Sequence, residues 1–293
     1  MIQDLMKRLE AVVHFLPPIP VVMTELLAAL DDENADMNSL AKIISRDPSM
    51  SMNVLKVANS AFYRLPYKVL AIDQAVRMLG IKEITMICIA CGAYSALKPP
   101  KGAKTFDSDE FWKHSVATGV ICKRLCSKVN IGGNGTIYLS GLLHDVGKII
   151  LDRFVHDIYT IIIQATTDEC IPMIEAEKRL LGESHATVGG WIMERWKLPS
   201  AFIDVAKFHH SVMDAPEESR TAVAISSLSD QLARIQHHGF GGDMGGIILS
   251  ETDAFKVLEK LNPAFADLDI VKMVWDLEDA NEEISEMESI LKN

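Results

Sequence analysis

Helix-boundary residues recur along this chain, and they constrain its fold more than any other sequence feature. Asp36 and the dipeptide Asp47-Pro48 each precede an apolar segment with near-helical spacing, as helix N-caps do. Gly80 suits a left-handed C-terminal cap, so a helix should end at Leu79. No run of alternating apolar and polar residues is long enough to predict a strand. The sequence therefore predicts an all-α fold.

A break in the helical pattern divides the chain. The segment Lys98-Pro-Pro-Lys-Gly-Ala-Lys104 combines proline, glycine and charge, which is typical of a linker. We expect a helical N-terminal lobe at residues 1–104, packed on a helical bundle at 105–250, and an acidic helical extension at 251–293. The bundle should hold helices at 110–128, 136–154 and 185–196, followed by helices that carry His209, His210 and Asp230.

The net charge of −11 is unevenly distributed. Residues 1–100 hold ten basic and ten acidic side chains, whereas residues 251–293 hold 12 acids against four lysines. This balance disfavours nucleic acid and anionic membranes, which bind basic surfaces. The helical region from Asp47 to Phe62 resembles a DNA-reading helix pair, but Lys56 and Arg64 are too sparse to contact phosphates. An apolar stripe on the acidic extension would pack on its own lobe or form a homodimer interface; it comprises Ile270, Val274, Leu277, Ile284, Met287 and Leu291.

The expected location is the cytoplasm. The longest strongly apolar run, from Ile84 to Leu97, has 14 residues, fewer than the roughly 18 to 20 of a membrane span. The first residues, Met1 to Arg8, do not resemble a secretory signal. An odd number of cysteines argues against a disulfide framework and predicts free, buried thiols at Cys88, Cys91, Cys122, Cys126 and Cys170.

The pair His144-Asp145 sets two metal-ligand types side by side in a segment that otherwise predicts an apolar helix. Burial of such a pair is costly unless it meets polar partners or a cation. Lys148 lies one turn further on, where it could hold a phosphate or pair with Asp145. Further candidate ligands lie in other predicted helices, and together they suit iron, manganese or zinc: His114, His185, His209, His210 and Asp230.

Each candidate also has a structural explanation. His114 could be a hydrogen-bonded histidine, His185 could lie at a helix start, and Asp230 could be solvated. Glu110 lies four residues before His114, but it more simply stabilises a helix N-terminus. The remaining histidines show no such pattern and are expected on the surface; they are His14, His156, His237 and His238.

Several ordered motifs across residues 10–235 resemble the HD-related output domain family, HDOD, of the HD superfamily. The segment Gly141-Leu-Leu-His-Asp-Val-Gly-Lys148 carries the likeness to the superfamily. The other motifs that resemble the family are Leu16-Pro-Pro-Ile-Pro20, Asp47-Pro-Ser-Met50, Val57-Ala-Asn-Ser-Ala61, Ala75-Val-Arg-Met-Leu-Gly80, Phe111-Trp-Lys-His-Ser115, Glu183-Ser-His-Ala186, Trp196-Lys-Leu-Pro199 and His209-His210.

The resemblance implies an all-helical bacterial signalling module with an HD-like bundle that acts on a protein partner. It implies a first metal site at His114, His144, Asp145 and Asp230. Further metals would be held by His185, His209 and His210, with Glu110 a weaker match and Lys148 as a phosphate contact. The segment Ser211-Val-Met-Asp-Ala-Pro216 lacks the Gly-Tyr-Pro signature of the cyclic-dinucleotide phosphodiesterases. The alternative to a regulatory module is a metal-dependent phosphohydrolase for a nucleotide or phosphate ligand, in which Asp145 and Lys148 would be catalytic.

Overall fold

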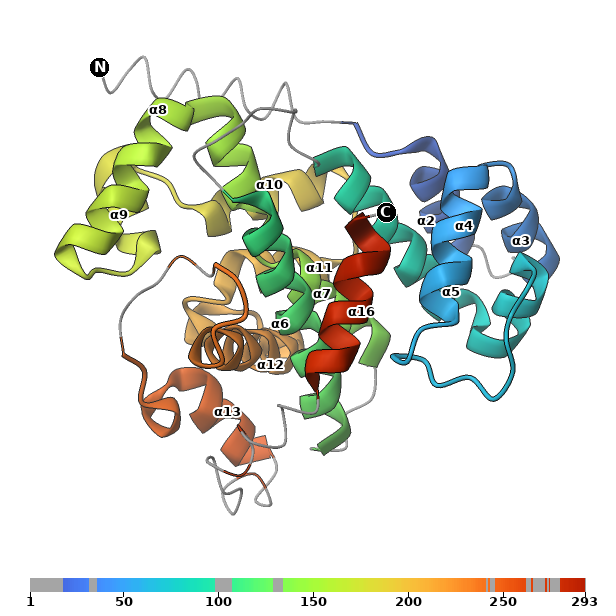
Figure 1. Ribbon diagram of the computed structural model, residues 1–293. Coiled ribbons are helices and arrows are strands. Elements are labelled where there is room, and N and C mark those ends of the chain that lie inside the picture. The colour runs from blue at the N-terminus through green and yellow to red at the C-terminus, as the bar shows by residue number, and fades with distance from the viewer. Residues whose placement is uncertain are drawn as a thin grey trace. The chain divides into compact units, whose positions relative to one another are not determined.

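A computed structural model describes residues 18–31, 36–97, 107–128, 134–240, 242, 246–261, 265, 272, 274 and 280–292. The regular elements among these residues are helices, with no strand (Figure 1). The predicted all-α fold is confirmed. The chain clusters into two compact units: the smaller comprises Pro17–Lys98 and Asp279–Asn293, and the larger contains Pro99–Glu278. The whole of the predicted linker, residues 98–104, lies outside the described residues, as does the chain start.

The smaller unit begins with helices whose predicted caps are confirmed. The Asp36 side chain accepts a hydrogen bond from the Ser39 backbone N at 2.6 Å. The Asp47 side chain accepts one from the Met50 backbone N at 3.0 Å, with Pro48 in the first turn. The helices of this unit are α2 (Val21–Asp31), α3 (Met37–Ser45), α4 (Pro48–Ala58), α5 (Ile72–Leu97) and α16 (Asn281–Lys292).

Gly80 interrupts helical geometry, as the sequence predicts, but it does not form a left-handed helix cap. Its φ of 85° and ψ of 163° lie in an extended region that glycine adopts without steric strain. The chain returns to helix directly afterwards, so α5 runs on through the apolar segment to Leu97. Gly80 therefore kinks one long element where the sequence predicts an end.

The C-terminal helix α16 packs within the smaller unit. The Glu286 carboxylate accepts a hydrogen bond from the Ala61 backbone N at 2.6 Å, just beyond α4. Three residues of the predicted apolar stripe, Ile284, Met287 and Leu291, are buried. Ile270 and Leu277 lie outside the described residues. These three residues thus pack against their own chain, whereas Val274 is half-buried.

In the larger unit, the structure differs from the prediction at the His144-Asp145 motif. The expected helix at 136–154 is two helices, because His144 and Asp145 form a turn between them. Apolar periodicity continues across this turn, so it gives no sequence signal. Two adjacent helical residues would point about 100° apart, whereas the turn brings both side chains to one site. The helices of this unit are α6 (Ser108–Lys128), α7 (Asn134–Leu143), α8 (Val146–Glu169), α9 (Met173–Leu181), α10 (His185–Arg195), α11 (Ser200–Phe208), α12 (Glu217–Ile235) and α13 (Asp253–Leu261), with 3-10 turns η1 (Val212–Asp214) and η2 (Leu249–Glu251).

None of the helices in the described part of the chain combines the length and apolar character that crossing a bilayer requires.

Candidate metal centre

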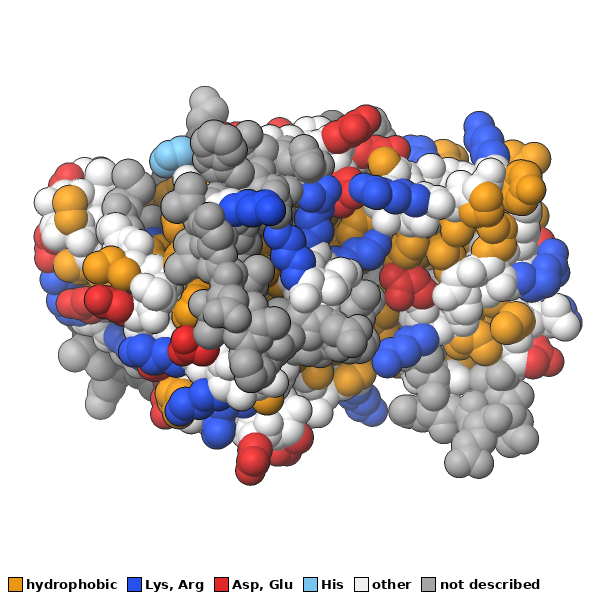
Figure 2. Space-filling view, turned by 90° about the horizontal axis from the view of Figure 1, so that it is seen from below, with side chains coloured by type: hydrophobic (Ala, Val, Ile, Leu, Met, Phe, Trp, Pro, Cys, Tyr) orange, Lys and Arg blue, Asp and Glu red, His pale blue; other side chains and the backbone are white. Residues whose placement is uncertain are grey.

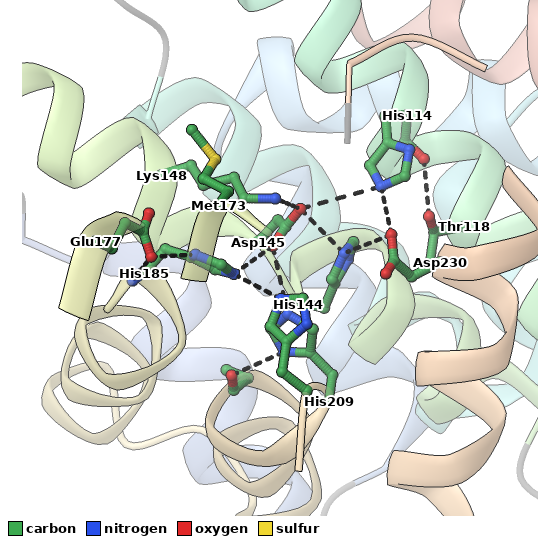
Figure 3. A network of polar contacts seen from close by, with 12 residues as sticks. His114, Thr118, His144, Asp145, Lys148, Met173, Glu177, His185, His209 and Asp230 are labelled. Carbon is green, nitrogen blue, oxygen red and sulfur yellow. Dashed lines mark hydrogen bonds and ion pairs between the residues drawn. The ribbon is translucent and has the colours of Figure 1, made fainter. Parts of the chain in front are cut away.

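Asp145 lies at the centre of a buried polar cluster in the larger unit (Figure 3). Its Oδ2 atom is 3.1 Å from His144 Nε2 and 2.5 Å from Lys148 Nζ. Its Oδ1 atom is 3.2 Å from His185 Nε2 and 3.5 Å from His209 Nε2. The two carboxylate oxygens therefore face two different groups of imidazoles.

The first group faces Asp145 Oδ2. Ligand atoms of His114, His144 and Asp145 lie within 4.8 Å of one another. Asp230 on α12 adds an oxygen, because its Oδ1 is 3.0 Å from His114 Nε2 and 3.8 Å from His144 Nε2. Helices α6 and α12 and the turn before α8 thus bring together the four residues of the predicted first metal site.

The second group faces Asp145 Oδ1. Ligand atoms of Asp145, His185, His209 and His210 also lie within 4.8 Å of one another. His185 is the first residue of α10, and its Nε2 is 3.0 Å from His210 Nε2. The sequence placed His209 and His210 in a helix, but both lie in the turn after α11. The two rings lie side by side at the end of α11, with their centroids 4.1 Å apart.

The histidines are held by their Nδ1 atoms, which leaves Nε2 directed at the cluster. His144 Nδ1 lies 2.7 Å from the Gly141 carbonyl oxygen, and His209 Nδ1 lies 2.9 Å from that of Ala206. His114 Nδ1 contacts the backbone oxygen of His238 at 3.2 Å. Such contacts fix the tautomer of metal-binding histidines and orient their rings.

Several atoms that face the cluster are buried and make no hydrogen bond, although each lies within 4.0 Å of a carboxylate oxygen or an imidazole nitrogen of the cluster. They are Nε2 of His114, His144 and His209, and Oδ1 of Asp145. A buried polar atom without a hydrogen bond costs about 1–3 kcal/mol, so this many at one point need a common explanation. Imidazole nitrogens and carboxylate oxygens are ligands of iron, manganese and zinc. The residues present therefore fit one or two divalent ions, and Asp145 belongs to both groups of candidate ligands.

Electrostatics keep Asp145 charged and the His209–His210 pair neutral. Burial alone would raise the pKa of Asp145, but His144 and Lys148 hold it well below its usual range. Burial lowers the pKa of His209 and of His210, and neighbouring imidazoles add to the effect. Metal ligands need a charged carboxylate and neutral imidazoles, so both states suit coordination.

Two predictions about nearby residues are resolved by the geometry. Glu110 is exposed in the first turn of α6 and belongs to neither described ligand group, which leaves its helix-stabilising role. The prediction that His238 lies on the surface is wrong, because only 8% of it is exposed and its backbone oxygen contacts His114. Sequence periodicity gave no sign of this, since His238 lies in a loop beyond α12. His156, by contrast, has a half-exposed side chain beside Asp152.

Glu177 is a site residue that sequence reasoning missed. It lies on α9 and is 0% exposed, and its Oε2 is 2.6 Å from His185 Nδ1. One sequence signal was present: Glu177 shares the buried face of an amphipathic helix with Met173, Ala176 and Leu181. A carboxylate on such a face requires a partner.

Fold and site together define an all-helical protein with a buried histidine–aspartate centre. The profile of the HDOD domain matches residues 16–212. The chain belongs to the HDOD domain family. It also matches two curated relatives described as uncharacterized, from Treponema pallidum (22% identity) and Bacillus subtilis (YuxH, 23% identity). The matches cover 75% and 65% of this chain but 42% and 48% of those proteins, so the chain spans less than half of either.

Solved structures show the same fold. An HDOD domain protein of unknown function from Geobacter sulfurreducens has a TM-score of 0.80 at 24% identity, covering 98% of both chains. A candidate phosphohydrolase from Shewanella amazonensis has a TM-score of 0.74 at 24% identity, covering 97% of this chain and 98% of its own. A candidate signal transduction protein from Marinobacter aquaeolei has a TM-score of 0.75 at 18% identity, covering all of this chain and 66% of its own.

Proposed function

We propose that this chain is a cytoplasmic regulatory module for bacterial signal transduction, which holds divalent metal in its buried centre and acts on a protein partner. The observation that carries the proposal is the set of buried Nε2 and Oδ1 atoms around Asp145 that make no hydrogen bond. The description of the Marinobacter aquaeolei structure as a candidate signal transduction protein supports the signalling role.

The proposed ligands form two groups that share Asp145. His114, His144 and Asp230 would complete the first, and His185, His209 and His210 the second. Iron, manganese and zinc are the ions that such mixed nitrogen and oxygen donors suit. The absence of the Gly-Tyr-Pro signature after His210 favours a structural or sensing use of the metal over cyclic-dinucleotide hydrolysis.

The surface of the smaller unit supports binding to a protein partner. Figure 2 shows hydrophobic side chains gathered over this unit, toward the right of the view. Large apolar side chains exposed on the unit include Val21 (74% exposed), Tyr67 (76%) and Leu70 (73%). Clustered exposed apolar groups are typical of interaction sites. The acidic balance of the chain disfavours nucleic acid as the partner.

A metal-dependent phosphohydrolase is the second candidate, and Lys148 favours it. Its Nζ atom lies beside Asp145 at the centre, and only 1% of the residue is exposed. A bound ion would supply a Lewis acid for a phosphoryl oxygen. Lys148 would then contact the anionic phosphate, while Asp145 and the imidazoles fix the position of the ion. The Shewanella amazonensis structure is described as a candidate phosphohydrolase.

One experiment separates metal occupancy from turnover. The wild-type chain and Asp145→Asn are purified, supplied with iron, manganese and zinc, and measured by elemental analysis and by assays on nucleotides, cyclic dinucleotides and phosphomonoesters. Asp152→Asn is the matched control, because Asp152 lies on α8 and pairs with His156 outside the centre. We expect metal in the wild type and the control, loss of metal in Asp145→Asn, and no turnover.

Two results would contradict this expectation, and they have different consequences. Rapid turnover that Asp145→Asn abolishes would establish the phosphohydrolase and overturn the regulatory proposal. A wild-type protein that takes up none of the three metals would remove the basis for both candidates.

A further inference from the structure

We propose that Glu177 is a positioning residue that sets the metal affinity of the second ligand group, formed by Asp145, His185, His209 and His210. It does so by holding the His185 ring in the orientation that coordinates metal. This inference rests on the proposed metal-binding function. It adds that Glu177 decides whether the centre holds a second ion.

Every polar contact of Glu177 serves to fix its position and that of His185. Its Oε2 atom accepts a hydrogen bond from the His185 backbone N at 2.8 Å and lies 2.6 Å from His185 Nδ1. Its Oε1 atom accepts one from the Tyr159 hydroxyl at 3.1 Å. Glu177 and His185 are both 0% exposed, so water does not compete for these contacts. The carboxylate is thereby held at the Nδ1 edge of the His185 ring.

His185 differs from the three other histidines of the centre whose Nδ1 contacts are described. His114, His144 and His209 have their Nδ1 atoms against backbone oxygens, which no side-chain substitution removes. His185 Nδ1 instead faces a carboxylate, an acceptor that is charged and replaceable. A carboxylate behind a metal-binding imidazole fixes the tautomer with Nε2 free to coordinate and raises the basicity of the ligand.

The position of His185 Nε2 links Glu177 to one ligand group and not to the other. This atom is 3.2 Å from Asp145 Oδ1 and 3.0 Å from His210 Nε2. Asp145 Oδ2, on the opposite side of the carboxylate, faces His144. Loss of Glu177 should therefore weaken the second metal position and leave the first in place.

The test compares Mn²⁺ binding by the full chain with that of Glu177→Gln, which is similar in size but lacks the charge. Metal-stripped proteins are titrated with Mn²⁺, the bound ions are counted, and electron paramagnetic resonance separates coupled ions from an isolated ion. Removal of such a supporting group costs about 10–100-fold in metal affinity. We expect two coupled ions in the wild type, and in Glu177→Gln a single isolated ion until Mn²⁺ is raised about 10–100-fold.

Two controls separate positioning from a merely structural role. Glu194→Gln makes the same chemical change on α10, at a side chain that is 48% exposed and pairs with Lys207. Tyr159→Phe removes the hydroxyl that contacts Glu177 but leaves both His185 contacts. Thermal melting tracks folding in every variant. We expect both controls to retain the coupled two-ion signal, even where Tyr159→Phe lowers the melting temperature.

The outcomes distinguish failure of this inference from failure of the proposed metal-binding function. If Glu177→Gln binds two ions as tightly as the wild type, or loses both positions equally, the inference is overturned and the metal-binding proposal stands. If Tyr159→Phe loses the second ion in proportion to its loss of stability, Glu177 acts only through folding, and the inference is again overturned. A wild-type chain that binds no Mn²⁺ overturns both.

Discussion

Asp145 and Lys148 form a deeply buried ion pair in the larger unit's polar cluster, since each residue is only 1% exposed. A buried charge that loses its countercharge typically destabilises a protein by about 3–5 kcal/mol. In the metal-free protein, Asp145→Asn should therefore lower the free energy of unfolding by about that amount. Replacing Lys148 as well, as in Asp145→Asn/Lys148→Met, should recover part of the loss. Urea denaturation in the presence of a chelator measures both, and an unchanged midpoint for Asp145→Asn would contradict the argument.

The protonation state of His185 leads to a prediction: metal binding should release a proton. Burial disfavours its protonated form, but the charge of Glu177 and the nearby Asp145 carboxylate raise the pKa of His185 to about 9. At pH 7 the metal-free imidazole therefore carries a proton that a metal ion must displace. Metal affinity should rise with pH up to about 9, as the bound proton is lost from the free protein.

Calorimetry at pH 7 checks this prediction. The enthalpy of Mn²⁺ binding should differ between buffers of different ionisation enthalpy, with the sign of proton release. Glu177→Gln removes the main cause that raises the pKa, so it should release fewer protons. Equal enthalpies in all buffers for the wild type would show that His185 is neutral before metal binds.

At the scale of elements, the crossing of α8 and α10 positions the ligands. Gly147 lies in the first turn of α8, and a Cβ atom there would be 1.9 Å from the His185 carbonyl oxygen and 2.8 Å from the Gly189 backbone N. Both atoms belong to α10, so a side chain at Gly147 would force the two helix backbones apart. Asp145 precedes one of these helices and His185 begins the other.

Gly147→Ala should consequently lower stability by about 1–3 kcal/mol or more and weaken the second metal position. Gly246→Ala is a matched control, because a Cβ atom there meets nothing within 4 Å. Urea denaturation and Mn²⁺ titration of the two variants make the comparison. Equal stability of Gly147→Ala and Gly246→Ala would mean that the helices separate at little cost.

At the scale of the whole molecule, burial separates the five cysteines into two chemical classes. Burial raises the pKa of Cys91, Cys122 and Cys126 to about 12, and that of Cys88 well above its usual value. Cys170 is exposed at the C-terminal end of α8, where the sequence predicted a buried thiol. The α8 periodicity gave no warning, because the residue lies past the last helical turn, with a φ of 53°.

A thiol reagent should therefore react rapidly with one cysteine of the folded chain and with five after denaturation. Cys170→Ser should remove the rapid reaction and leave four slow thiols. The slow phase should follow the opening of the fold, since thiolate formation and access both require it. Rapid labelling of Cys122 in the folded chain would contradict the described core.

The sequence alone was sufficient for the helical class, the caps at Asp36 and Asp47, and the identity of the candidate ligands. Helix caps and amphipathic spacing depend on residues within a turn or two of one another, so local sequence records them. The motif around His144 and Asp145 indicated which residue types are candidate ligands. It did not indicate that His144 and Asp145 occupy a turn between two helices.

Only the tertiary structure decided which distant groups meet. It placed Glu177 behind His185, brought the His238 backbone oxygen to His114, and set the two oxygens of Asp145 toward different imidazoles. These contacts depend on how whole helices pack, and neither residue type nor spacing along the chain carries that information. A buried polar atom is satisfied by whatever the fold brings within about 3 Å of it.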